Sequence, residues 1–206
     1  MRPRIGIIDY GMGNLRSVSK AVERLGGSVY VGSDVKTLAH LPKLIIPGVG
    51  AFGDAMTELK RRKLISLIQD SARSGKQILG ICLGLQLFFE HSAESPDVRG
   101  LGIWKGMVPR FKPRKNQKLK IPHMGWNEVL LKKNSPLTKG VKNRSFFYFV
   151  HSYYGDPKDR KMIVGETRYG VSFPSILSSG NIFAVQFHPE KSQATGLQIL
   201  KNFIRL

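Results

Sequence analysis

The stretch at residues 77–90, QILGICLGLQLFFE, decides how this chain folds. Its first part, residues 77–81, is short and apolar and follows Gly75, a pattern typical of a buried strand. The second part, residues 83–90, has helical character with an apolar face. Gly80 and Gly84 lie two residues before and after Cys82, which is the spacing of a sharp strand-to-helix turn that presents a nucleophile. We therefore expect a strand, a tight turn at Cys82 and a helix in direct succession.

Cys82 is the only cysteine of the chain. At the start of a helix its thiol would be activated, because the aligned peptide dipoles favour the thiolate form. The alternative is an inert core residue, since free cysteines are often buried. The two flanking glycines favour a reactive thiol, because a crowded turn needs small neighbours and a merely buried cysteine does not.

A histidine and a glutamate far downstream supply the partners that a thiol nucleophile needs. His188 and Glu190 follow residues 182–187, IFAVQF, which are predicted to form a strand. Residues two apart in an extended chain share a face, so the imidazole and the carboxylate point the same way. Pro189 cannot donate a ladder hydrogen bond, which indicates that the strand ends at a sheet rim. A lone histidine is more often an ordinary core or surface residue, but this pair and Cys82 together predict a Cys-His-Glu triad.

The rest of the chain alternates between predicted strands and predicted helices. This order indicates an α/β fold with a doubly wound, largely parallel central sheet and helices on both faces. Between about residues 107 and 169, strand-like segments are joined by polar turns, so we expect an additional antiparallel section. We expect a single domain over residues 1–206. The predicted strands lie at residues 4–9, 28–31, 44–46, 126–131 and 145–150, and the predicted helices at residues 14–25, 55–71 and 196–206.

Two glycine-rich segments follow predicted strands. Residues 47–50, PGVG, leave the third strand, and sheets of this type build their sites at the carboxyl ends of parallel strands. Backbone N–H groups in this segment could turn towards an oxyanion that develops near Cys82. Residues 9–14, DYGMGN, could cradle a phosphate, but they lack the full pattern of a dinucleotide site.

Length and composition place the chain among globular proteins. It has 206 residues, 41% of them hydrophobic, which is enough to bury a sizeable core. One cysteine allows no internal disulfide, which indicates a reducing compartment. No apolar run approaches the ~20 residues of a membrane span, and residues 4–9 end in an acid, unlike a signal peptide. We therefore expect a cytoplasmic protein that makes no membrane contact.

The net charge of the chain, +19, is high. Basic residues gather within residues 60–63, 105–120 and 132–144, and residues 112–120 have the composition of a solvated loop. Such an excess would suit a module that binds nucleic acid. The clusters are dispersed, however, and none forms a recognised nucleic-acid module, so we expect no nucleic-acid partner. Solubility, or a partner with an acidic face, explains the charge better.

Several segments together resemble one family. Residues 80–86 and 188–190 are similar to the triad-type (class I) glutamine amidotransferases. More narrowly, the chain resembles the glutaminase subunits of imidazole glycerol phosphate synthases, which act in histidine biosynthesis, and this resemblance runs essentially from end to end. The segments that carry it are residues 9–14 (DYGMGN), 47–52 (PGVGAF), 122–127 (PHMGWN) and 151–153 (HSY).

The resemblance implies a reaction and a set of residues that perform it. The Cys82 thiolate would attack the carboxamide of glutamine with His188 as general base and Glu190 as its orienting partner, giving a γ-glutamyl thioester that water hydrolyses. Further residues would bind the oxyanion or the substrate, and no metal or organic cofactor is implied. The oxyanion would be held near Val49, Gly50 and Leu83, and the glutamine by Gln86, Glu94, Ser152 and Tyr153.

The resemblance also implies a partner for the ammonia that the reaction releases. Ammonia released to solvent would be protonated and unreactive, so the expected partner is a (β/α)8-barrel cyclase subunit that docks as a heterodimer and receives it. There the ammonia would yield imidazole glycerol phosphate and aminoimidazole carboxamide ribotide. Two alternatives stay open, namely the same triad feeding another synthase and a basic binding module with a degenerate triad. The positions that match the interface of the family are Asn14, Trp126, Tyr148 and Lys191.

Overall fold

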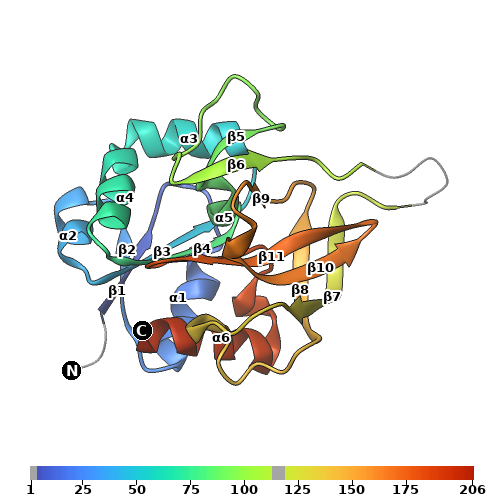
Figure 1. Ribbon diagram of the computed structural model, residues 1–206. Helices are drawn as coiled ribbons and strands as arrows, with labels where there is room; N and C mark the ends of the chain where they lie inside the picture. Colours follow the sequence, from blue (N-terminus) through green and yellow to red (C-terminus); the bar gives the residue numbers. More distant parts are fainter. Residues whose placement is uncertain (1–3, 113–118) are drawn as a thin grey trace.

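The computed structural model describes residues 4–112 and 119–206 of the chain (Figure 1). The predicted solvated loop at residues 112–120 lies largely outside these ranges. Within them, nine strands form a mixed sheet in the order β2-β1-β3-β4-β12-β11-β10-β7-β8. Three more form a small second sheet in the order β5-β6-β9.

One half of the large sheet is parallel and carries the predicted nucleophile strand at its centre. In this half, β4 lies between β3 and β12, and β1 joins β3 to β2, all in parallel pairs. The middle strands β3 and β4 are buried along nearly their whole length, as is typical of parallel strands covered on both faces. The bounds are β1 (Arg4–Ile8), β2 (Ser28–Gly32), β3 (Lys43–Gly48), β4 (Gln77–Cys82) and β12 (Ile182–Val185).

The other half of the large sheet is antiparallel. Strand β11 pairs with β12 and β10, and β7 pairs with β10 and β8, each in the antiparallel sense. The predicted fold class, a largely parallel sheet with an antiparallel section, is therefore confirmed. The bounds are β7 (His123–Leu131), β8 (Ser145–His151), β10 (Ile163–Tyr169) and β11 (Val171–Ser179).

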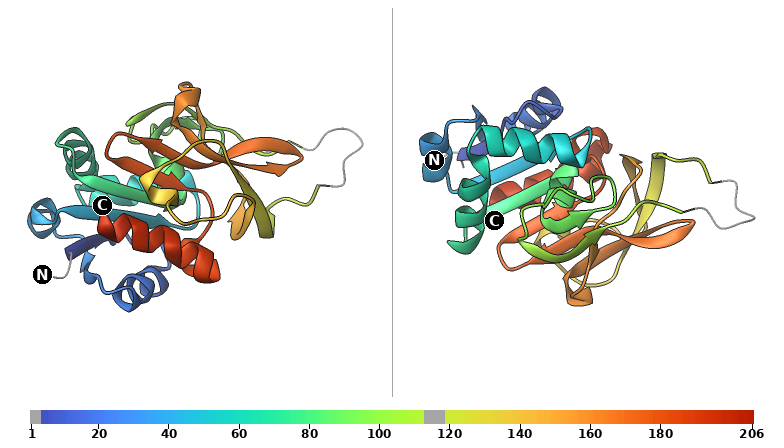
Figure 2. Two further views of the ribbon diagram at one scale, coloured as in Figure 1. Left: turned by 60° about the horizontal axis from the view of Figure 1, so that its bottom comes forward. Right: turned by 90° about the horizontal axis from the view of Figure 1, so that it is seen from above.

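Helices cover both faces of the parallel half, and each face has its own hydrophobic core (Figures 1 and 2). On one face lie α2 (Val35–His40), α3 (Phe52–Arg61), α4 (Leu64–Arg73) and α5 (Leu83–Leu87), and on the other α1 (Leu15–Arg24) and α6 (Gln193–Arg205). The small sheet of β5 (Phe89–Ser92), β6 (Trp104–Val108) and β9 (Asp156–Pro157) lies beyond α5. Short 3-10 turns complete the chain: η1 (Pro136–Thr138), η2 (Arg160–Met162) and η3 (Pro189–Lys191).

Two predicted helices differ from the observed ones, one because it is divided and one because it ends early. The helix predicted at residues 55–71 is two helices, α3 and α4, because Lys63 between them has a left-handed φ of 58°. The helix predicted to run to Glu90 ends at Leu87, and β5 starts two residues later. Phe88 and Phe89 both meet Trp104 edge-on, with ring centroids 5.0 and 5.9 Å away. Burial of these rings in the small sheet outweighs the local helical preference.

None of the helices in the two described ranges has both the length and the apolar character needed to cross a membrane.

Candidate active site

Cys82 lies at a strained turn between β4 and α5. Its backbone has φ 54° and ψ −107°, a conformation that a non-glycine residue rarely adopts. The turn is possible only because its neighbours are small. A Cβ atom at Gly84 would lie 1.8 Å from the carbonyl oxygen of Ile46, and one at Gly80 would lie 2.7 Å from the Phe88 ring. The structure thus has the strand, turn and helix that residues 77–90 predict.

The sulfur of Cys82 is surrounded by polar groups although the residue is buried. Its Sγ lies 3.9 Å from the carbonyl oxygen of Val150, which can accept the thiol proton in a hydrogen bond. The side-chain amide of Gln186 donates to the same sulfur at 3.8 Å. Burial, and then the negative charge of Cys82, raise the pKa of Tyr10, so its hydroxyl stays neutral and donates to the carbonyl of Pro47 at 2.8 Å.

His188 and Glu190 are held together at the start of η3. The imidazole Nδ1 lies 2.9 Å from Oε1 of Glu190, and both side chains are almost fully buried. Since a carboxylate only accepts, Nδ1 carries the proton of this bond. His188 Nε2 has no hydrogen-bond partner within the part of the chain that the structure describes. The free nitrogen of the pair is therefore the one that could take a proton from a thiol.

The charge of Cys82 acts on the imidazole of His188. Burial is the largest single influence and lowers the pKa of His188, but the negative charge of Cys82 and the contact with Glu190 together outweigh it. The net effect raises the pKa of His188 well above its ordinary value. Sγ of Cys82 also lies close enough to the imidazole to raise its pKa by direct polar contact, although Nε2 has no partner with full hydrogen-bond geometry among the described residues. The charge effect nevertheless favours an imidazolium beside a thiolate, which is the reactive form of a cysteine nucleophile.

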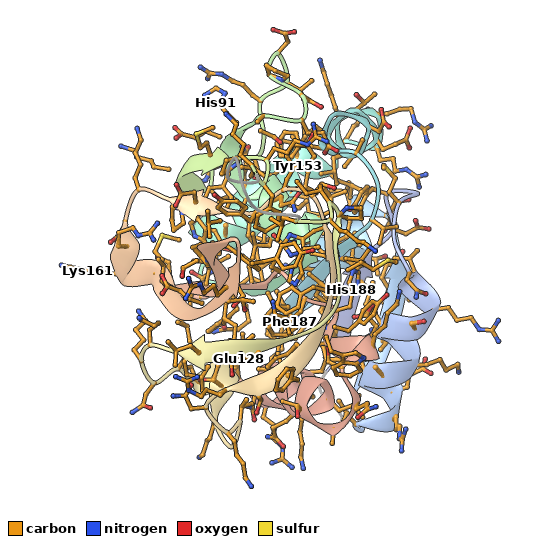
Figure 3. All side chains as sticks on the ribbon, turned by 90° about the vertical axis from the view of Figure 1, so that its right-hand side faces the viewer. His91, Glu128, Tyr153, Lys161, Phe187 and His188 are labelled. Carbon is orange, nitrogen blue, oxygen red and sulfur yellow. The ribbon has the colours of Figure 1, made fainter. Side chains whose placement is uncertain are left out.

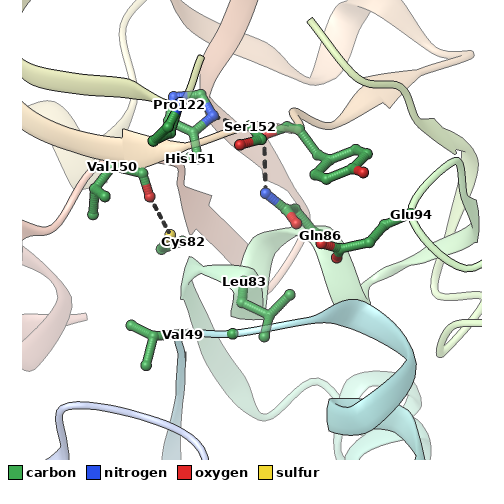
Figure 4. A pocket seen from close by; sticks show the side chains of 11 residues that line it. Val49, Cys82, Leu83, Gln86, Glu94, Pro122, Val150, His151 and Ser152 are labelled. Atoms are coloured by element: carbon green, nitrogen blue, oxygen red, sulfur yellow. Dashed lines mark hydrogen bonds between the residues drawn. The ribbon is translucent and has the colours of Figure 1, made fainter.

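A cavity of about 340 Å³ opens onto Cys82 (Figure 4). This volume lies within the range of small-molecule sites. The cavity is lined by the predicted nucleophile, by all three predicted oxyanion residues and by all four predicted substrate residues. His188 and Glu190 are not among the lining residues; His188 is itself buried, and Figure 3 labels its position next to Phe187. The sequence-predicted lining residues are Val49, Gly50, Cys82, Leu83, Gln86, Glu94, Ser152 and Tyr153.

The glycine-rich segment after β3 reaches the cavity as predicted from its place in the sheet. Gly48 is paired in register with Cys82, so Val49 and Gly50 follow directly beside the thiol. Gly50 has a φ of 101°, which favours glycine, and a Cβ there would lie 2.6 Å from the side chain of Met12. Because Gly50 carries no side chain, the backbone N–H groups of the Val49–Gly50 segment can come close to a ligand in the cavity.

Some polar atoms of the predicted substrate residues Gln86 and Glu94 already form hydrogen bonds within the protein. Gln86 Nε2 donates to the carbonyl of Tyr153 at 3.0 Å and to Oε1 of Gln186 at 3.3 Å. Because both of its N–H groups are occupied, Gln86 can offer a ligand only its carbonyl oxygen. Glu94 Oε2 accepts from the backbone N–H of Phe52 at 2.7 Å, at the start of α3. This contact anchors the carboxylate at the mouth of the cavity.

Three of the four predicted interface residues meet on one surface. The rings of Trp126 and Tyr148 contact each other edge-on at 6.2 Å, and Lys191 Nζ lies 5.8 Å from the centre of the Tyr148 ring. Trp126 is 47% exposed, so it is not a core aromatic residue. Asn14 lies at the start of α1, where its Oδ1 accepts from the N–H of Ser17, and α1 contacts η3.

Sequence reasoning missed the polar residues that surround the triad. Gln186, which contacts the thiol, directly follows β12 and lies two residues before His188, and that spacing is a signal that could have found it. His151 lines the cavity and bonds to His123, but nothing local in either segment shows that they meet. In residues 4–112 and 119–206, no three His, Cys, Asp or Glu side chains gather as they would around a metal ion.

These features define the class of protein. A cysteine at a strand-to-helix turn, a buried His-Glu pair and a glycine-rich segment beside it fit a thiol-dependent amidotransferase, and residues 6–206 match the family described as "Glutamine amidotransferase class-I". The structure also superposes on that of PurLQS from Thermotoga maritima with a TM-score of 0.75, at 22% identity, covering 100% of this chain and 97% of that one.

Relatives in sequence identify the subgroup of this family to which the chain belongs. The chain is 48% identical over 203 residues to imidazole glycerol phosphate synthase subunit HisH of Moorella thermoacetica, covering 98% of this chain and 94% of that protein. It is 49% identical over 204 residues to the subunit of the same name from Methanocaldococcus jannaschii, covering 98% and 99%. The chain belongs to the HisH family of imidazole glycerol phosphate synthase subunits.

Proposed function

We propose that this chain is the glutaminase subunit of an imidazole glycerol phosphate synthase in histidine biosynthesis and that Cys82 is its nucleophile. The observation that carries the proposal is the cavity lined by Cys82, whose charge acts on the imidazole of the bonded His188–Glu190 pair. The names of the relatives favour this synthase over others with the same triad.

In the first half of the proposed reaction, His188 Nε2 takes the thiol proton and the thiolate attacks the carboxamide carbon of glutamine. The negative charge moves to the carboxamide oxygen, where the N–H groups of Leu83 and of the Val49–Gly50 segment stabilise it. The imidazolium then returns the proton to the leaving nitrogen, the C–N bond breaks, and ammonia leaves a γ-glutamyl thioester on Cys82.

In the second half, water replaces ammonia. His188 takes a proton from the water as it attacks the thioester carbonyl, and the C–S bond breaks to give glutamate and the thiolate. Glu190 keeps the imidazole in the tautomer whose Nε2 accepts, and it stabilises the imidazolium of each intermediate step. Gln86, Glu94, Ser152 and Tyr153 would hold the amino-acid end of glutamine in the cavity.

The partner that we propose is a (β/α)8-barrel cyclase subunit, docked over the mouth of the cavity. Support comes from the exposed apolar side chains on the outer face of β7 and β8, which include Met124, Trp126 and Phe146. Aromatic rings exposed together in this way are typical of the centre of a protein interface. Tyr148 and Lys191 extend this surface, and we propose that Asn14 borders it. We further propose that residues 1–206 act as one domain.

The experiment that tests this function is glutamate release from glutamine. The chain is assayed alone and with a cyclase barrel plus its nucleotide ligand, and Cys82→Ala serves as the control. We expect strong stimulation by the barrel and none in the variant. Activity that ignores the barrel would support the triad but contradict the partner, and undiminished activity of Cys82→Ala would contradict the nucleophile.

A further inference from the structure

A line of buried polar side chains runs from the cavity to strand β7. His151 Nδ1 lies 2.7 Å from the carbonyl oxygen of Tyr153, and His151 Nε2 lies 3.0 Å from Nδ1 of His123. His123 Nε2 in turn lies 3.1 Å from Nδ2 of Asn127. Both imidazoles are buried among aromatic rings, and His123 is stacked between Phe149 and Tyr169. A polar atom left without a partner in such surroundings would be costly, so the direction of each bond is informative.

The Asn127 end fixes the tautomer of His123. Asn127 Oδ1 accepts from the N–H of Glu128 at 2.8 Å, and its Nδ2 donates to the carbonyl of Arg168 at 3.1 Å. These two backbone partners orient the amide, so its second N–H must point at His123 Nε2. His123 Nε2 is therefore an acceptor, and the proton of the neutral ring is on Nδ1, facing His151.

The hydrogen bond to the carbonyl of Tyr153 independently fixes the tautomer of His151, with the proton again on Nδ1. A carbonyl oxygen only accepts, so the Nδ1 of His151 that faces Tyr153 must carry a proton. His151 Nε2 then accepts the proton that His123 presents. Both rings are neutral in this arrangement, in agreement with burial, which lowers the pKa of His123 to about 4 and, as the largest of several influences, that of His151 to about 3.

The donor direction reverses at the carbonyl of Tyr153, which connects the two histidines to the amides beside the sulfur. The carbonyl of Tyr153 accepts from both His151 and Gln86, and Gln86 uses its other N–H on Oε1 of Gln186. With its oxygen engaged, the Gln186 amide must turn its N–H groups towards Cys82, where Nε2 lies 3.8 Å from Sγ. Reversal of any member would place two acceptors or two donors against each other.

We propose that His151 and His123 are positioning residues, a neutral relay locked in the Nδ1–H form that holds the Tyr153 carbonyl in place, and that this carbonyl in turn orients the Gln86 and Gln186 amides so that an N–H faces the reacting sulfur. The proposal rests on the proposed function only in taking Cys82 as the reacting thiol. It assigns a role to side chains from β7 and β8 that lie outside the triad, and Asn127 sets the direction of the two histidines. Figure 4 shows the cavity end of this line at His151 and Gln86.

The first test reads the tautomers directly by nitrogen-15 NMR of labelled histidine in the folded chain. With the signals of the five histidines assigned individually, we expect His123 and His151 both to show Nδ1–H with an unprotonated Nε2, the less common neutral form, with imidazole protons protected from exchange. In Asn127→Asp, the nearly isosteric carboxylate can only accept, so His123 should switch its proton to Nε2. A His123 that keeps the Nδ1–H form in Asn127→Asp, or an Nε2–H form of His123 or His151 in the unaltered chain, would overturn the proposal.

The second test follows Cys82 itself, whose alkylation by iodoacetamide is unambiguous because the chain has one cysteine. His123→Phe keeps the stacked ring but removes both nitrogens, whereas His123→Asn keeps a donor near the Nδ1 position and loses the ring. We expect the alkylation rate at fixed pH to fall about fivefold in His123→Phe, a factor typical of one lost hydrogen bond. In His123→Asn the rate should return most of the way to that of the unaltered chain. A role in packing alone predicts the opposite order.

A third variant shows whether the relay acts through the amide at the sulfur. Gln186→Leu removes the N–H donor at the end of the line and should slow alkylation at least as much as His123→Phe. If the relay works through Gln186, the double variant should react no more slowly than Gln186→Leu alone. Circular dichroism is used to confirm that each variant is folded. If the double variant His123→Phe/Gln186→Leu reacts more slowly than Gln186→Leu by the full factor seen in His123→Phe alone, the proposal is overturned. None of these readouts needs glutamine or a partner, so they can fail separately from the proposed function.

Discussion

Replacement of Gly84 by alanine is the sharpest structural test of the turn at Cys82. The added Cβ would lie 1.8 Å from the carbonyl oxygen of Ile46, whereas an ordinary carbon–oxygen contact is about 3.3 Å. Strand β3 and helix α5 would therefore have to separate by about 1.5 Å. Both elements are buried and close-packed here, so the interior cannot absorb this displacement cheaply.

The expected cost has two parts. Overpacking of this severity should lower the free energy of unfolding by about 3 kcal/mol. The shift should also move the sulfur away from the proposed catalytic pair, His188 and Glu190, and a displacement of about 1 Å can cost a factor of about 100 in rate. We therefore expect Gly84→Ala to reduce glutamine hydrolysis by at least about 100-fold even under conditions where the variant is fully folded.

Urea denaturation measures the first effect, and glutamate release in the presence of the cyclase subunit measures the second. Gly180→Ala is the matched control, because a Cβ there meets nothing within 4 Å although its φ is 57°. That control should lose about 1 kcal/mol through backbone strain and keep its activity. A Gly84→Ala variant with the stability and activity of the control would refute the reasoning about the turn.

Three further predictions concern charge and docking. Glu190→Gln removes the carboxylate that fixes the tautomer of His188, so kcat should fall by about 10⁴, as for a mis-set triad histidine, while KM stays within a few-fold; unchanged kcat would contradict the triad. For His123, whose pKa is lowered in the folded state, the unfolded chain binds more protons between pH 6.5 and 4, so stability is lost as the pH falls through this window. Between pH 6.5 and 5 the free energy of unfolding, measured by urea titration, should fall by about 2 kcal/mol more in the unaltered chain than in His123→Phe. An equal fall in both proteins would contradict this effect of His123. Lys191→Ala should weaken binding of the cyclase subunit in calorimetry and reduce its stimulation, with no change in fold, because the ammonium lies over Tyr148 at the surface; full stimulation would remove Lys191 from the interface.

Local sequence was enough to predict the parallel half of the fold and the turn at Cys82. The glycines at positions 80 and 84 are required by contacts within a few residues of the turn or with the adjacent strand. The spacing of His188 and Glu190 predicted that their side chains meet, and they do, but through the 3-10 turn η3 rather than along an extended strand. Gly48 and Cys82 could be placed side by side because neighbouring parallel strands end at one edge of the sheet.

Other features depend on contacts that no local pattern contains. Phe89 enters a strand because Trp104, fifteen residues away, completes its packing. The small sheet was not predicted, since β9 has only two residues and pairs with a strand about fifty residues earlier. His123 and His151 meet only because β7 and β8 pair in one particular register. Such pairings are set by the tertiary fold, and a single sequence does not show them.

The central claim is that Cys82 carries the glutamyl group during the reaction. The most direct measurement is mass spectrometry of the acid-quenched protein, mixed with glutamine, the cyclase subunit and its nucleotide ligand. The account predicts a mass increase of one γ-glutamyl group on the peptide that contains Cys82, with accumulation of the adduct altered by changes at His188. Steady glutamate release with no adduct on that peptide, and with full activity in Cys82→Ala, would contradict it.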